Sequence, residues 1–213
     1  MAQAGPADPA LAHRVLEAHG ILASVAWAAI MPLGAILIRL IPSGKAWLVH
    51  GAVMGVGLAM FTAAFGLGLW DMSQYHSTIS KFAHTIIGTV MFAFAWLQPF
   101  LSVAHHYIYQ RTSKRALISA VHVYFGRLLI ITGMINGGIG LATAKQSTRA
   151  ENIIYGTLVG VIWVVYTLLS LGFEVKRGNK AQWALQRVSS TRSSGSSGSY
   201  DHVRGSVGKS EMS

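Results

Sequence analysis

The stretch AWLVHGAVMGVGLAMFTAAFGLGLW, residues 46–70, decides the fold. It carries no charged side chain and contains one histidine, His50. At a rise of about 1.5 Å per residue, a helix of this length crosses the roughly 30 Å hydrocarbon core of a bilayer. An imidazole at that depth is costly and marks a functional site by default. The stretch therefore predicts a membrane helix whose histidine has a chemical role.

Four further segments are long and apolar enough to span a bilayer. Three have no charged side chain and one is interrupted only by Arg127; they are residues 18–38, 82–110, 116–144 and 152–173. Of the 213 residues, 52% are hydrophobic and only 11% are charged. These features predict an all-α polytopic membrane protein with five transmembrane helices rather than a soluble domain.

Cysteine is absent from the sequence. This excludes disulfides, thiolate metal sites, iron–sulfur clusters and covalent haem attachment, so a bound metal would depend on histidine. The net charge is +10, and the basic residues lie mainly in the predicted loops and tail. That distribution favours anionic lipid, and not nucleic acid, as the partner of the basic surface.

The membrane face that holds the N-terminus is called side A, and the opposite face side B. Basic residues near helix ends are about twice as frequent on side B, which places side B in the cytoplasm and the N-terminus outside. We expect the plasma membrane as the location. The predicted parts are a short N-terminal segment (1–12), a transmembrane domain (13–177) and a cytoplasmic tail (178–213), whose Ser/Gly-rich run predicts disorder.

One histidine lies near the start of each of four consecutive spans; the four are His19, His50, His84 and His122. The first and third spans start on side A, and the second and fourth start on side B. Depth therefore pairs His19 with His84 and His50 with His122, which are diagonal partners in a four-helix bundle. A flat macrocycle between diagonal helices needs this geometry. The pattern predicts a four-helix di-haem core, with the two iron levels about 25–30 Å apart.

Other readings of the histidines stay open. A zinc site is disfavoured because each pair offers two ligands and no carboxylate or thiolate completes a tetrahedron. A transporter or proton relay, with histidines lining a cavity, would bind no haem. A membrane anchor that displays an extracellular domain would bind haem without passing electrons.

Residues one helical turn beyond the histidines are mostly small. Gly88, Gly126 and Ala23 occupy these positions after His84, His122 and His19, whereas Met54 follows His50. Small residues on the ligand's face leave room for a porphyrin. They also permit close helix packing in membranes, so the pattern supports haem without requiring it.

Two arginines are candidate cofactor contacts. Arg127 lies within the fourth span, where it needs a partner such as a haem propionate or Gln98. Arg39 ends the first span on side B, where it contacts lipid phosphate or the side B haem. Further along, Asn136 is expected to make an interhelical hydrogen bond, and Tyr155 to anchor the membrane interface.

With these motifs, the chain resembles the cytochrome b561 domain family, in the fungal form that often follows an extracellular DOMON haem domain. The resemblance covers residues 11–176 and rests on AHGILASVAWAAIMPLGAILIRL, WLVHGAVMGVG, AHTIIGTVMFAFAWLQP, LSVAHH and HVYFGRLLIITGMINGGIGL, which begin at residues 18, 47, 83, 101 and 122. It implies two non-covalent b-type haems, each held by two histidines in the pairing above.

The resulting hypothesis is a transmembrane oxidoreductase, similar to ferric reductases, that moves single electrons between the two haems. The expected partners are membrane lipid, an electron donor on the cytoplasmic side, an extracellular haem or flavin domain or a ferric chelate as acceptor, and a second copy of the chain.

Overall fold

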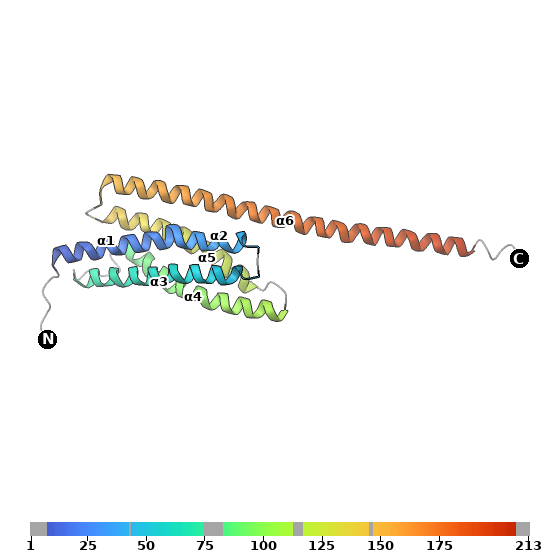
Figure 1. Ribbon diagram of the computed structural model, residues 1–213, viewed down its shortest axis with the longest axis horizontal. Coiled ribbons are helices and arrows are strands. Elements are labelled where there is room, and N and C mark those ends of the chain that lie inside the picture. Colours follow the sequence, from blue (N-terminus) through green and yellow to red (C-terminus); the bar gives the residue numbers. More distant parts are fainter. Residues whose placement is uncertain (1–7, 43, 75–82, 113–116, 145–146, 208–213) are drawn as a thin grey trace. The chain divides into compact units, whose positions relative to one another are not determined.

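The computed structural model describes residues 8–42, 44–74, 83–112, 117–144 and 147–207, and within these ranges it is helical with no strand. The elements are α1 (Pro9–Val25), a π-turn η1 (Ala26–Ile30), α2 (Met31–Leu40), α3 (Ala46–Gln74), α4 (Ala83–Thr112), α5 (Leu117–Thr143) and α6 (Arg149–Val207) (Figure 1). α1, η1 and α2 form one span.

Five of these helical spans are long and apolar enough to cross a membrane. They are Pro9–Leu40, Ala46–Gln74, Ala83–Arg111, Leu117–Thr143 and Arg149–Lys176. Large apolar side chains along them are exposed, which suits helices that face lipid. The predicted all-α fold with five membrane-spanning helices is confirmed.

The local sequence explains where two of the helices, α1 and α6, begin. The Asp8 side chain accepts a hydrogen bond from the Ala10 amide at 3.0 Å, and Pro9 starts the helix with the fixed φ that suits its first position. Thr148 and Glu151 form a reciprocal capping box before α6, with bonds of 2.6 and 3.2 Å. The first helix thus begins at Pro9, inside the segment 1–12 that the sequence sets apart.

The chain divides into two compact units, and the break lies inside α6 after Tyr166. In the second unit the described helix continues to Val207, whereas the Ser/Gly-rich composition predicts disorder across 178–213. Proline is absent from this stretch of sequence, and a helix that is already nucleated gains one hydrogen bond for each residue it adds. Residues 208–213 of the predicted tail lie outside the described residues.

In the first unit, four spans pack as a ring. The span α1–η1–α2 packs along α3, α3 contacts α4, α4 packs along α5, and α5 contacts α1 (Figure 1). The first and third spans are therefore diagonal, and so are the second and fourth. This is the arrangement that the sequence predicts for the four histidine-bearing helices.

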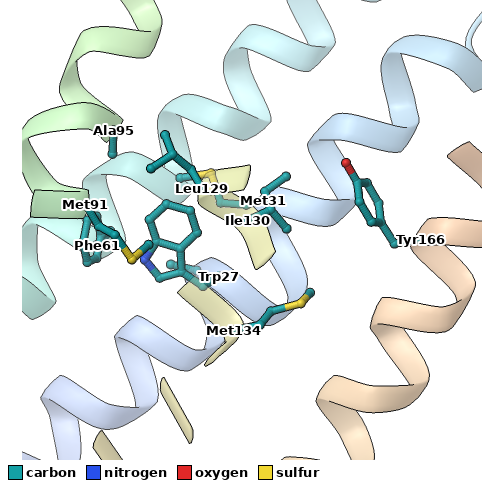
Figure 2. Close-up of a cluster of buried hydrophobic side chains, with 10 residues drawn as sticks. Trp27, Met31, Phe61, Met91, Ala95, Leu129, Ile130, Met134 and Tyr166 are labelled. Carbon is teal, nitrogen blue, oxygen red and sulfur yellow. The ribbon is translucent and has the colours of Figure 1, made fainter. Parts of the chain in front are cut away.

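A cluster of buried apolar side chains packs inside the bundle (Figure 2). Along α3 it lies between the two histidine levels, because its member Phe61 comes between His50 and Ala64, whose carbonyl bonds to His19. The Trp27 indole is at its centre and makes an edge contact with Phe61, with ring centroids 5.0 Å apart. The cluster comprises Ala26, Trp27, Met31, Phe61, Met91, Ala95, Leu129, Ile130, Met134 and Tyr166. It separates the side A end of the ring from the side B end with closely packed apolar material.

Candidate functional site

The side A pair consists of His19 on α1 and His84 on α4. Their ring centroids are 5.9 Å apart and their planes cross at 88°. The Nδ1 atom of His19 lies 2.7 Å from the Ala64 carbonyl oxygen of α3, and that of His84 lies 2.9 Å from the Asn136 carbonyl oxygen of α5. Each ring is thus fixed by the backbone of a neighbouring helix.

The side B pair consists of His50 on α3 and His122 on α5. Their centroids are 6.4 Å apart and their planes cross at 89°. The Nδ1 atom of His50 lies 2.8 Å from the Gly34 carbonyl oxygen of α2. The structure therefore brings all four histidines together in the two pairs predicted from their depths.

The hydrogen bonds determine which ring nitrogen is available for a ligand. A carbonyl oxygen can only accept, so the Nδ1 atoms of His19, His50 and His84 must carry the proton and donate it. In the neutral imidazole the other nitrogen, Nε2, then has a free lone pair. This is the tautomer and second-shell partner typical of metal-bound histidine.

The spacing of the rings fits a six-coordinate metal between them. Two metal–nitrogen bonds of about 2 Å, plus roughly 1 Å from each nitrogen to its ring centre, place two centroids about 6 Å apart. The observed separations are 5.9 and 6.4 Å. Among the described residues, no group of three or more His, Cys, Asp or Glu side chains could hold a metal ion. Two imidazoles that share a metal with a macrocycle would therefore suit these pairs better than a tetrahedral ion held by protein ligands alone.

Two glycines that sequence reasoning missed lie against the side A rings. A Cβ atom at Gly68 would lie 3.0 Å from the His19 ring, and one at Gly140 would lie 2.6 Å from the Cε1 atom of His84. Each glycine follows, by one helical turn, the residue whose carbonyl holds the same ring (Ala64 or Asn136). Each imidazole thus rests on a backbone acceptor and a glycine of one neighbouring helix.

A repeated spacing carries this information in the sequence. His50 and Gly68 are eighteen residues apart on α3, and His122 and Gly140 are eighteen residues apart on α5. Eighteen residues are about five turns of an α-helix, so both members of each pair lie on one face. α3 and α5 therefore each provide a histidine to side B and a support for a histidine on side A.

The π-turn brings the first span into the same pattern. His19 and Gly34 are fifteen residues apart, whereas His50 and Ala64 are fourteen apart. Because a π-turn closes i→i+5 bonds, it takes one residue more than an α-turn. Fifteen residues that include η1 therefore turn the helix about as far as fourteen without it. Gly34 is in this way directed toward His50, although the sequence gives no sign of the bulge.

The distance between the two levels can be read along α3. His50 belongs to one level, and Ala64 and Gly68 support the other, fourteen to eighteen residues along the helix. At about 1.5 Å per residue this is about 21–27 Å. The lower part of this range falls below the 25–30 Å expected from the sequence, because the rings bond back to residues nearer the membrane centre.

The small residues one turn beyond the histidines face polar side chains. A Cβ atom at Gly88 would lie 3.4 Å from the Asn136 Nδ2 atom, and one at Gly126 would lie 3.8 Å from the Gln98 Oε1 atom. Met54 packs against Gly34, with its Sδ atom 2.7 Å from where a Cβ would be. These contacts agree with close helix packing, and porphyrin clearance at Gly88 and Gly126 stays a prediction.

The two candidate arginines differ in their surroundings. The Arg127 guanidinium carbon lies 5.6 Å from the ring centre of Tyr124 on its own helix. Gln98 does not bond to it, since both side-chain polar atoms of Gln98 are buried and have no hydrogen-bond partner among the described residues. Arg39 donates a hydrogen bond to the Ala35 carbonyl of its own helix. Contact of either arginine with a cofactor stays a prediction.

Comparison with known proteins gives two relatives in Arabidopsis thaliana, both cytochrome b561 and DOMON domain-containing proteins. One is 29% identical over 177 residues, which are 79% of this chain and 42% of that protein. The other is 25% identical over 155 residues, 72% of this chain and 38% of that protein. The chain thus spans about two fifths of the length of the curated relatives it matches. No family model matches the chain, and no solved structure matches it. The resemblance to the cytochrome b561 family is confirmed by these two relatives.

Proposed function

We propose that this relative of the cytochrome b561 and DOMON domain-containing proteins conducts electrons across a membrane through two non-covalent b-type haems. His19 and His84 would hold the side A haem, and His50 and His122 the side B haem. The observation that carries the proposal is the pairing of imidazoles from diagonal helices, at two depths, with centroids 5.9 and 6.4 Å apart.

The donor set fits haem in its chemistry as well as in its spacing. Each haem would supply a one-electron couple, whose potential depends on its axial ligands, their hydrogen bonds and burial. In this chain the Ala64, Asn136 and Gly34 carbonyls orient three of the four imidazoles and increase their basicity. The Trp27 cluster keeps water from the space between the two levels.

Direction, partners and location are further parts of the proposal. The bias of basic residues supports side B as the cytoplasmic face, so the electron donor would act there and a ferric chelate or an extracellular redox domain would accept electrons on side A. On side B, Trp47 lies one turn before His50 and stacks on His106, with centroids 4.5 Å apart. This aromatic contact borders the end of the bundle that a donor would approach. Lipid contact, a second copy of the chain and a plasma-membrane location rest on the sequence alone.

Haem content of ligand variants tests the proposal. The chain is purified from membranes, and haem b per chain is measured by its pyridine haemochrome spectrum. We expect two haems in the wild type and one in each of His19→Leu, His84→Leu, His50→Leu and His122→Leu. The first two variants should lose the same haem, and the last two the other haem, as judged by redox titration. His106→Leu should retain both haems, because His106 stacks on Trp47 outside the pairs.

Two outcomes would contradict the proposal. A colourless wild-type chain would favour a histidine-lined transporter or proton relay. Loss of both haems from a folded His84→Leu variant would show that the two pairs do not bind independently.

A further inference from the structure

Tyr155 joins the fifth membrane span to the ring of four. Its hydroxyl donates a hydrogen bond to the Met134 carbonyl of α5, at 2.9 Å. The hydroxyl fills the space that a side chain at Gly137 would take, and the ring lies 3.6 Å from where a Cβ of Gly138 would be. Because Gly137 and Gly138 have no side chains, they leave room on α5 for this tyrosine. The interfacial anchoring expected for Tyr155 is replaced by a contact between helices.

The same stretch of α5 supports the side A pair from a neighbouring face. The Asn136 carbonyl accepts the proton of His84, and Gly140 lies against the His84 ring. Since each residue turns an α-helix by about 100°, the face that meets Tyr155 (Gly137 and Gly138) and the face that meets His84 (Asn136 and Gly140) are centred about 130° apart. Tyr155 and His84 therefore contact adjoining faces of the same two turns of α5.

We propose that Tyr155 is a positioning residue for the side A haem, which acts through the α5 backbone on His84. The inference rests on the proposed function. By fixing α5, the tyrosine hydroxyl sets the distance from the Asn136 carbonyl to the Nδ1 atom of His84. A strong bond there makes the ligating nitrogen a better electron donor, which favours ferric over ferrous iron.

The test is Tyr155→Phe in the full-length protein with haem bound. The two midpoint potentials are measured by optical redox titration, and the ferric haems by electron paramagnetic resonance, which responds to the angle between the axial ring planes (88° in this pair). We expect two haems per chain, a shift of the side A midpoint to higher potential, a changed side A resonance signal, and an unchanged side B haem. In a His84→Leu background, which retains only the side B haem, adding Tyr155→Phe should change nothing.

Matched variants separate positioning from loosening of the bundle. Gly137→Ala puts a methyl group where the tyrosine hydroxyl lies, so it should shift the same haem in the same direction while Tyr155 is retained. Tyr166→Phe removes a buried hydroxyl on the same helix that has no hydrogen-bond partner among the described residues, so it should shift neither haem. Gly156→Ala adds a methyl group with nothing within 4 Å and should also be neutral.

The inference is overturned if Tyr155→Phe and Gly137→Ala retain two haems and leave both midpoints and both signals unchanged. It is equally overturned if they shift both haems alike, or if Tyr166→Phe gives the same shift. If Tyr155→Phe does not fold, Gly137→Ala alone decides between these outcomes. A wild-type chain without haem would instead defeat the proposed function.

Discussion

At the scale of single residues, the partner of Nδ1 decides what each imidazole can do. For His19, His50 and His84 that partner is a backbone carbonyl, which leaves Nε2 unprotonated in the neutral ring. A proton relay works best when a histidine can exchange protons at both nitrogens. A ring held at one nitrogen by an obligatory acceptor is better suited to hold a metal with the other.

Gly140 allows a first test at this scale. In Gly140→Ala the added methyl group would lie 2.6–3.1 Å from three atoms of the His84 ring, so the ring must leave its place beside the Asn136 carbonyl and His19. We expect the side A haem to be lost or to bind at least tenfold more weakly, within the 10–100-fold range for changes in the surroundings of a metal ligand. Haem retention during dilution, followed by absorbance, measures the change.

The control for Gly140→Ala is Gly160→Ala on α6, where a Cβ would meet nothing within 4 Å. Equal haem retention in the two variants would show that the glycine at position 140 does not support the ligand.

At the scale of elements, α3 and α5 have the same design. Each carries a histidine at one end and, about five turns along the same face, a glycine that supports a histidine of the other pair. The first span also serves both levels, since it carries His19 at one end and, beyond the π-turn η1, the Gly34 carbonyl that bonds to His50. The first span, α3 and α5 thus each contact histidines at both levels, so a change in how these helices pack should move the ligands.

Gly133 on α5 provides a test of the packing between the levels. A side chain there would overlap the Trp27 indole at the centre of the buried cluster. Because overpacking a closely packed core costs about 1–3 kcal/mol, Gly133→Ala should lower the thermal unfolding midpoint of the protein in detergent. Gly156→Ala serves as the control, and a Gly133→Ala protein as stable as this control would mean that α5 is packed differently against Trp27.

The histidine pairs and the five spans were predictable because both depend on strong physical constraints. Apolar length identifies a span, and an imidazole in hydrocarbon is rare enough to stand out. The carbonyls of Ala64, Asn136 and Gly34 could not be predicted, because every residue has a carbonyl and only the packing of the helices selects one. The π-turn and the contact of Tyr155 with Met134 likewise depend on how neighbouring helices meet.

At the scale of the whole molecule, the bundle has two histidine levels about 21–27 Å apart along α3, with a buried apolar cluster between them, and each level would hold one of the two proposed haems. Such a molecule should pass electrons from one side of a membrane to the other without moving any other solute.

Electron transfer through sealed vesicles tests this claim most directly. Vesicles that contain the purified chain are loaded with a membrane-impermeant reductant, and a membrane-impermeant ferric chelate is added outside. We predict chelate reduction that depends on the protein and is lost in both His84→Leu and His50→Leu. A wild-type chain that holds two haems but passes no electrons, or a His50→Leu variant that conducts as well as the wild type, would contradict it.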